Sequence, residues 1–354
     1  MPCFIFGTKD SYPNLPVRIT NLPGYSIIRD DLLPLGFGTK WRKVWGLVSQ
    51  VPKSAQNGPK NVLLWGAIHG NYLASFSFIL RRSGFSVETI AYTKDPILRT
   101  YNERLVRAHS QSIHCYANRT LAYEAFTKKK ENFEGLCLPE FGIHPSAEMG
   151  LHLFWKELKS QMPKKAILLL EIGSGLSFLS AYDFFWGSQI QVRGLMVGES
   201  KTSWLSKREN LQKELGLLPR PIPEDWIWDE NMQDTNVSLT KPQTMSMSSH
   251  PPERQSKRFG NGFQKNKPWI QNYYEKTKIL LEPVYSAGSL RFVLGEEFPF
   301  DQDPKGLSTM HPMSAPKKSN EMNLFLSKGK VPLFYLHQGG HVQHLDLVCL
   351  NPQR

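Results

Sequence analysis

The sequence predicts an α/β fold with open, largely parallel sheets, and two observations support this prediction. Short apolar runs typical of buried strands alternate with segments of helical character, and glycine-rich turns separate them. The chain has 354 residues, 40% of them apolar, so it can bury one large core or two moderate ones. In sheets of this kind ligands bind beyond the carboxyl ends of strands, where these turns lie.

The expected elements follow the same order in two stretches of the chain. In the first, a strand at 61–65 leads through the turn Gly66–Gly70 into a helix at 72–82 and a strand at 85–92. In the second, a strand at 166–172 leads through the turn Gly173–Ser177 into a helix at 178–186 and a strand at 191–197. A further helix is expected to begin near Lys40, and a late strand at 331–336.

Composition argues against several classes of protein. No apolar run is long enough to span a membrane, and the N-terminal segment lacks the basic start and sustained apolar stretch of a secretory signal. The four cysteines lie far apart without a CxxC pair, which favours reduced thiols in a cytoplasmic protein. The net charge of +12 comes from scattered basic residues, so nucleic-acid binding rests on charge alone and is not expected to be the main function.

Lys40 follows Gly36-Phe37-Gly38-Thr39 and stands where a helix is expected to begin, with Thr39 as its cap. An amine at a helix N-terminus feels the positive end of the helix dipole, which disfavours its protonated form. A neutral lysine is what covalent attachment of an aldehyde cofactor requires. By its local sequence alone, Lys40 with Arg42 and Lys43 fits an ordinary solvated first turn better than a cofactor site.

Three further segments carry candidate ligand-binding residues. The small residues of Gly173–Ser177 between a strand and a helix suit a phosphate, although a plain turn explains them equally well. Asn71 could cap a helix or donate its amide to an oxygen of a ligand ring, and Tyr285 could simply be a packing residue. His337, His341 and His344 are close in sequence, but Gly339 and Gly340 interrupt any helix between them, so no metal site is expected.

The order of these motifs resembles that of a known enzyme family. The segments, in chain order, are Arg29-Asp30-Asp31-Leu32, Gly38-Thr39-Lys40-Trp41-Arg42-Lys43, Gly66–Tyr72, Pro139–Pro145, Gly173–Ser177, Leu281-Glu282-Pro283-Val284-Tyr285 and His337-Gln338-Gly339-Gly340. They are similar to the motifs of the fold-type-II pyridoxal-phosphate enzymes of the 1-aminocyclopropane-1-carboxylate (ACC) deaminase and D-cysteine desulfhydrase family. The Lys40 motif and the Leu-Glu-Pro-Val-Tyr segment are the most specific parts of a resemblance that covers nearly the whole chain.

The resemblance implies a tryptophan synthase beta-like fold in two domains. A large domain that binds pyridoxal 5'-phosphate would comprise residues 1–45 and 151–354, and a small domain residues 46–150. Two segments near 219–258 and 298–320 are rich in Pro, Ser, Gln, Met or Lys and are interpreted as loop insertions in the large domain.

The resemblance also assigns roles to single residues. Lys40 would hold the cofactor covalently and then serve as the base that moves protons, with Tyr285 against the ring or near the substrate. Asn71 would bond the ring oxygen, and Ser286 stands at the position that faces the ring nitrogen. The phosphate would be held by Gly173, Ser174, Gly175, Leu176 and Ser177.

Several positions depart from the family pattern. Gly70 replaces a serine that contacts the substrate carboxylate, Thr39 an asparagine, Tyr72 a histidine, and Phe263 stands where a tyrosine is frequent. Ser286 replaces the glutamate that keeps the ring nitrogen protonated in the deaminases. A neutral hydroxyl gives a weaker electron sink, which favours thiol elimination over opening of a cyclopropane ring.

The sequence therefore predicts elimination or deamination of a small amino acid, of the D-cysteine desulfhydrase kind, with release of ammonia and a 2-oxo acid. The alternatives are an ACC deaminase, or a degenerate relative that binds the cofactor without catalysis. The resemblance to the family implies a homodimer, and no membrane or nucleic-acid partner is expected.

Overall fold

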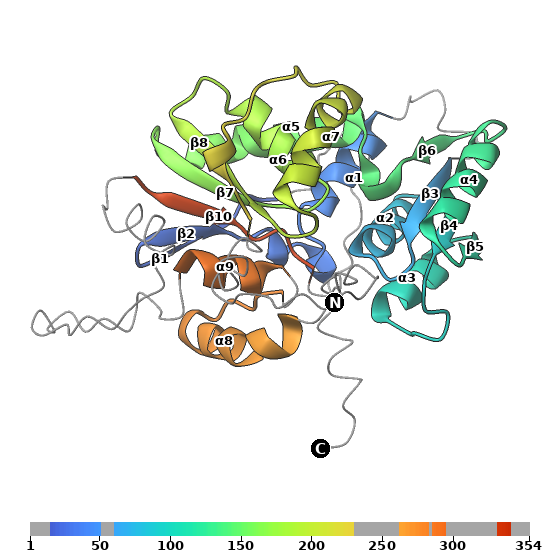
Figure 1. The fold of residues 1–354 in the computed structure, drawn as a ribbon, viewed down its shortest axis with the longest axis horizontal. Coiled ribbons are helices and arrows are strands. Elements are labelled where there is room, and N and C mark those ends of the chain that lie inside the picture. Colours follow the sequence, from blue (N-terminus) through green and yellow to red (C-terminus); the bar gives the residue numbers. More distant parts are fainter. Residues whose placement is uncertain (1–14, 51–59, 230–261, 283–284, 295–330, 341–354) are drawn as a thin grey trace, which may run out of the picture.

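The computed structural model describes residues 15–50, 60–229, 262–282, 285–294 and 331–340. Within these residues the chain forms two mostly parallel sheets that lie in separate lobes, each accompanied by helices (Figure 1). This arrangement confirms the predicted α/β class.

The larger sheet has six strands in the order β1-β2-β10-β7-β8-β9. Only β1 and β2 pair antiparallel in this sheet as described. Because β10 lies between β2 and β7, the last part of the described chain completes a sheet that the first part began. The strands are β1 (Ile19–Leu22), β2 (Tyr25–Ile28), β7 (Ala166–Ile172), β8 (Ile190–Met196), β9 (Ile227–Asp229) and β10 (Leu333–Leu336).

Alternate residues of β7 face opposite sides of this sheet, as strand geometry requires. Leu168 and Leu170 belong to the core that packs against α6, whereas Ile167 and Leu169 belong to a separate core with residues of α8 and α9. Figure 1 shows α8 and α9 beneath the sheet, with α5, α6 and α7 above it. These helices are α5 (Pro145–Gln161), α6 (Leu176–Phe184), α7 (Lys201–Glu214), α8 (Gly262–Thr277) and α9 (Ser286–Leu294).

The smaller sheet has four strands in the order β5-β4-β3-β6, and all of their described pairings are parallel. Trp65 of β3 packs against Phe126 with ring centroids 5.7 Å apart, within a small core on one face. The elements of this lobe are β3 (Asn61–Ala67), α2 (Asn71–Arg82), β4 (Ser86–Tyr92), α3 (Tyr101–His109), β5 (Ser112–Tyr116), α4 (Arg119–Lys130) and β6 (Leu136–Leu138).

The helix α1 (Lys40–Ser49) crosses α5 at a contact between glycines. A Cβ atom at Gly46 would lie 2.0 Å from the carbonyl oxygen of Ser146, and one at Gly150 would lie 2.1 Å from the carbonyl oxygen of Arg42. Real Cβ atoms do not approach backbone this closely, so the crossing requires glycine at both positions.

Two sequence-based expectations about the fold need correction. Residues near 219–258 were expected to form a loop insertion, yet β9 (Ile227–Asp229) lies inside this range and pairs with β8. It follows the 3-10 helix η5 (Glu224–Trp226); the other short helices are η1 (Asp30–Leu32), η2 (Pro34–Gly36) and η4 (Glu140–Gly142). The segment 298–320 lies outside the described residues.

The helices that the structure describes include none with the length and apolar character needed to cross a membrane. The helix expected at 178–186 spans residues 176–184, because Gly175 ends the preceding turn in a left-handed conformation with φ +91°.

Substitution Gly150→Ala tests the helix crossing. The new methyl group would meet the backbone of α1, so we expect the free energy of unfolding to fall by about 1–3 kcal/mol, the usual cost of overpacking. Urea unfolding measures this change. Ser160→Ala, at an exposed position of α5, is the matched control and should alter stability by no more than about 0.5 kcal/mol. Equal effects of the two substitutions would contradict the assignment.

Candidate active site

Three loops meet at the carboxyl edge of the six-stranded sheet. Strands β2, β10 and β7 are parallel neighbours, so the segments that follow them emerge at the same edge. The segment after β2 leads to Lys40, that after β10 is His337–Gly340, and that after β7 begins at Gly173. Motifs that are roughly 300 residues apart in the sequence therefore share one place.

The first two of these loops touch through their backbones. The N–H of Gly340 donates to the carbonyl oxygen of Gly36 at 2.6 Å. At Gly38, which has φ +59°, a Cβ atom would lie 1.7 Å from the carbonyl oxygen of Gln338. Glycine is thus required at position 38 both for its backbone conformation and for this contact.

A buried ion pair anchors the start of α1. The guanidinium of Arg42 donates to both carboxylate oxygens of Asp30, at 2.7 and 2.8 Å, and to the carbonyl oxygen of Leu15 at 3.0 Å. It also lies over the ring of Phe154, 3.9 Å from the centroid. The pair holds the turn that carries Lys40, two residues earlier, against the body of the large lobe.

Thr39 does not cap α1 in the way the sequence predicts. It is the residue before the helix, but its backbone already has helical angles and its side chain makes no capping hydrogen bond. The side chain is buried at 1% exposure.

Lys40 is half-buried and lies near two carboxylates. Burial lowers the pKa of its amine, while the negative charges of Glu282 and Glu171 act in the opposite direction. Lys43, one helical turn further along α1, is also buried, and desolvation together with the charge of Lys40 lowers its pKa to about 7. The start of α1 thus presents two amines that lose protons more easily than free lysines do.

Glu282 organises the start of α9. Its side chain is fully buried, and Oε2 accepts from the backbone N–H groups of Tyr285 at 2.6 Å and Ser286 at 3.3 Å. A Cβ atom at Gly340 would lie 2.8 Å from Cγ of Glu282. These contacts place Tyr285, Ser286 and the His337–Gly340 loop around the same point.

Asn71 belongs to the site from the side of the small lobe. Helix α2 begins at Asn71 itself and Gly70 precedes it as the cap residue, so the interpretation of Asn71 as a cap was wrong. The side chain of Asn102 donates to Oδ1 of Asn71 and to the carbonyl oxygen of His69, both at 2.9 Å. Nδ2 of Asn71 then turns toward the large lobe, 3.5 Å from where a Cβ atom of Gly340 would lie.

The turn after β7 has the features of an anion cradle. Nothing lies within 4 Å of a Cβ atom built at Gly173, so the space beside this backbone is open. The hydroxyl of Ser177 is buried and has no hydrogen-bond partner among the residues the structure describes. Leu176 and Ser177 form the first turn of α6, whose N-terminal N–H groups attract negative charge.

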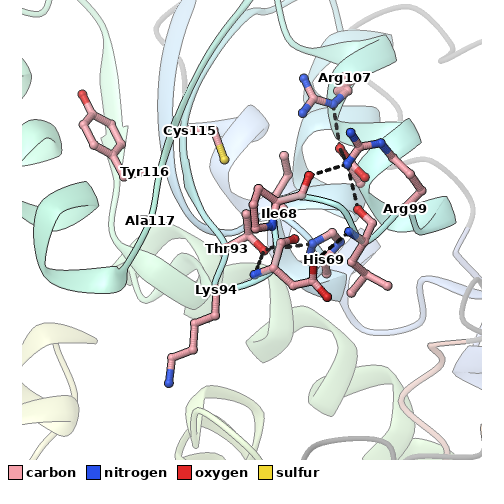
Figure 2. Close-up of a pocket in the computed structure, with 13 residues that line it drawn as sticks. Ile68, His69, Thr93, Lys94, Arg99, Arg107, Cys115, Tyr116 and Ala117 are labelled. Carbon is pink, nitrogen blue, oxygen red and sulfur yellow. Dashed lines mark hydrogen bonds and ion pairs between the residues drawn. The ribbon is translucent and has the colours of Figure 1, made fainter.

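A separate recess lies at the carboxyl edge of the small sheet (Figure 2). It has a volume of about 310 Å³ and includes His69, Arg99, Glu103 and Arg107 in its lining. His69 is held by the hydroxyls of Thr100 and Thr93 at 3.0 and 3.2 Å, and Glu103 pairs with both arginines. None of the site residues predicted from the sequence lines this recess.

Sequence reasoning missed three side chains that the structure brings to the site: Lys43, Asn102 and Glu171. Glu171 had a visible signal, because it is the only charged residue in the apolar strand at 166–172. Its burial and its neighbours depend on elements more than 100 residues away. Asn102 carries no local signal, since nothing in the sequence shows that α3 faces Asn71.

Some predicted residues are not tested by the structure. His341 and His344 lie outside the described residues, and so does the side chain of Phe263. His337 is fully buried, with Nδ1 3.3 Å from the hydroxyl of Ser286 and Nε2 donating to the carbonyl oxygen of Leu280 at 3.0 Å. Among the described residues no three His, Cys, Asp or Glu side chains are grouped to hold a metal ion.

Comparison with known proteins identifies the fold. No protein-family model and no curated protein sequence matches the chain. Among solved structures, an ACC deaminase homologue is similar over 95% of this chain and 94% of its own, with 18% identity and a TM-score of 0.63. An O-ureido-L-serine synthase covers 96% of this chain and 93% of its own at 8% identity and a TM-score of 0.55.

A hydrogen sulfide-producing enzyme from Fusobacterium nucleatum is also similar, over 92% of this chain and 95% of its own, with 12% identity and a TM-score of 0.52. The chain therefore has the tryptophan synthase beta-like fold of the fold-type-II pyridoxal-phosphate enzymes, as the sequence predicts.

Lys43 makes the stability of the cofactor-free protein depend on pH. An unfolded chain holds the lysine proton up to a pH of about 10.4, whereas the folded protein releases it near pH 7. Between these values only the unfolded state binds the proton, so stability falls as the pH falls from about 10 to about 7.

Lys43→Met should remove this penalty and raise the free energy of unfolding at pH 7 by about 2–4 kcal/mol, with the gain vanishing above about pH 10.5. Urea unfolding at several pH values measures it. Lys156→Met, at an exposed position of α5, is the control. A gain that does not change with pH would show that packing, and not the buried amine, is responsible.

Proposed function

We propose that this chain is a pyridoxal-phosphate enzyme that eliminates or deaminates a small amino acid, in the manner of a D-cysteine desulfhydrase, and releases ammonia and a 2-oxo acid. The observation that carries the proposal is the pairing of Lys40, an amine with a lowered pKa, with an anion cradle at the same sheet edge. A cytoplasmic location and a homodimer are part of the proposal.

The residues present fit this cofactor. The unpartnered hydroxyl of Ser177, the open space beside Gly173 and the N-terminus of α6 suit its phosphate. Trp204 fills the space behind Gly175, where a Cβ atom would lie 2.5 Å from the indole nitrogen. Lys40 would hold the aldehyde carbon, and Asn71 would donate its Nδ2–H to the ring oxygen. Ser286 would face the ring nitrogen.

When bound, pyridoxal phosphate supplies an electron sink for the bond that breaks next to the substrate amine. The lowered pKa of Lys40 then suits it as a base, because a neutral amine can accept a proton from the α carbon of the substrate. Burial of the surrounding side chains keeps water away from this proton. Tyr285, whose backbone is fixed by Glu282, would pack against the ring or the substrate.

Two features favour elimination from a small thiol-bearing amino acid. Ser286 has a hydroxyl at the position where an acid would keep the ring nitrogen protonated and make the cofactor a strong electron sink. Elimination of a thiol needs a weaker electron sink than opening of a cyclopropane ring does. One structure of the same fold is described as a hydrogen sulfide-producing enzyme. The ACC deaminase alternative is supported by the homologue of that activity among the similar structures.

The proposal is tested by incubating the purified chain with pyridoxal phosphate. We expect a long-wavelength absorption band of lysine-bound cofactor, which Lys40→Ala abolishes because the attachment point is lost. Release of sulfide, ammonia and a 2-oxo acid from D-cysteine, measured against other small D- and L-amino acids, identifies the reaction. Lys156→Met should keep both the band and the activity.

Two results would count against the proposal, each in a different way. Absence of the band in the unmodified chain would refute cofactor binding altogether. A band without turnover of any small amino acid would support the alternative of a non-catalytic relative, for which Gly70 in place of a substrate-binding serine is the motivation.

Asn102 provides a test of how the ring oxygen is bound. Asn102→Asp would place a carboxylate oxygen against Oδ1 of Asn71 and the carbonyl of His69, which now accept from the amide. Asn71 would turn its oxygen toward the cofactor, and we expect the dissociation constant of pyridoxal phosphate to rise about tenfold. Asn118→Asp is the control, because Asp also caps helices well at this exposed position.

A further inference from the structure

We propose that Glu171, acting through Ser286, keeps the ring nitrogen of the bound cofactor protonated. From its position on β7, Glu171 would thus replace the acid that is absent at position 286. This inference rests on the proposed function, since it assumes that the site holds pyridoxal phosphate. It concerns a positioning residue on a strand, whereas the family pattern places the acid at the start of α9.

The alternation of β7 directs Glu171 toward α9. Ile167 and Leu169 belong to the core that contains residues of α8 and α9, and Glu171 is the next residue of the same face. The core cannot accept a charge there without partners. At the carboxyl end of the strand, however, Glu171 reaches polar groups of the site.

The carboxylate of Glu171 is buried, at 8% exposure, and is hydrogen-bonded by the hydroxyl of Tyr335 from the neighbouring strand. Burial raises the pKa of Glu171 above its usual value, and the hydroxyls of Tyr335 and Ser286 and the charge of Lys40 act in the opposite direction. The side-chain amide of Gln338 donates to the backbone oxygen of Glu171 at 2.9 Å and holds this end of the strand in place.

Ser286 has a single hydroxyl proton and three acceptors that compete for it: Nδ1 of His337, the carboxylate of Glu171, and the oxygen of Tyr335, whose own proton goes to Glu171. Nε2 of His337 faces a carbonyl oxygen, which can only accept, so Nε2 carries a proton and Nδ1 of a neutral imidazole is an acceptor. The second acceptor is the carboxylate of Glu171. Whichever of them takes the proton, the oxygen of Ser286 is left with lone pairs for a third partner.

A hydroxyl that can only accept selects the protonated ring. An unprotonated pyridine nitrogen needs a donor, which Ser286 cannot provide while its proton is engaged, whereas a protonated nitrogen donates to the free lone pairs. A positive ring in turn favours the ionised form of Glu171, and the negative charge of this carboxylate behind the hydroxyl then stabilises the ring. The other titratable groups around this point are Lys40, Glu282, Tyr285, Tyr335 and His337.

A proton held through a hydroxyl gives an electron sink of intermediate strength. It is stronger than a lone serine would provide, because a carboxylate stands behind the serine. It is weaker than an acid in direct contact with the ring, because the charge is further away. This intermediate strength remains compatible with thiol elimination.

The experiment uses the full chain reconstituted with pyridoxal phosphate labelled with ¹⁵N in the ring, and the ¹⁵N NMR shift reports the protonation of this nitrogen. We expect the unmodified chain to hold a protonated nitrogen at pH 7. In Glu171→Gln the ratio of protonated to unprotonated nitrogen should fall about tenfold at this pH, while the cofactor stays bound to Lys40. An unchanged shift in Glu171→Gln overturns the proposal.

Two further variants make the result specific. Glu148→Gln is the matched control, because Glu148 is also a partly buried carboxylate bonded by a serine, Ser180, at 3.2 Å, with its pKa raised by burial. It should leave the nitrogen shift unchanged. Adding Ser286→Glu to Glu171→Gln returns an acid to the ring nitrogen and should restore the protonated shift, which a role of Glu171 in packing alone would not predict.

The outcomes separate this inference from the proposed function. If the unmodified chain binds no cofactor, the proposed function fails. If the cofactor binds and Glu171→Gln leaves the nitrogen shift unchanged, only the inference fails. Should Glu171→Gln not fold, Ser286→Ala decides, because it removes the acceptor and leaves the contact of Glu171 with Tyr335 intact; loss of the protonated shift then supports the inference.

Discussion

The ion pair between Arg42 and Asp30 holds the first turn of α1 in the lobe that contains the six-stranded sheet. Lys40 belongs to this turn, so the ion pair also fixes the position of Lys40. Both side chains are buried, and the guanidinium is satisfied by two carboxylate oxygens, a backbone carbonyl and the ring of Phe154. Buried charges are tolerated only with such complete pairing, and removing one partner typically costs about 3–5 kcal/mol. The position of Lys40 is thus tied to the integrity of the core.

Around this anchor the site is assembled from loops that share one edge of a sheet. Parallel pairing of β2, β10 and β7 brings their carboxyl ends together, and backbone contacts at Gly38 and Gly340 close the gap between two of the loops. Glu282 joins the start of α9 to the same point. From the small lobe Asn71, oriented by Asn102, lies close to Gly340.

Acidic and basic groups are distributed here in a way that differs from the family pattern. The acid expected after Tyr285 is absent, while a buried acid stands on β7 behind the serine that replaces it. Lys40 and Lys43 lie within one helical turn of each other; burial lowers the pKa of both amines, and the charge of Lys40 lowers that of Lys43 further. A site that places amines of lowered pKa beside buried carboxylates is suited to proton transfer.

The sequence by itself determined the class of fold and the strands β3, β4, β7, β8 and β10, because apolar runs and glycine turns are local properties. It also predicted Lys40 and the turn at Gly173, through the order of their motifs. Only the tertiary structure decided that Thr39 and Asn71 do not cap helices, and that Asn102 and Glu171 belong to the site. The alternation of side chains along a strand shows which face of the sheet a residue occupies, but it does not show which other elements pack against that face. The partners of Glu171 come from β10 and α9, more than 100 residues away, and only folding brings them together.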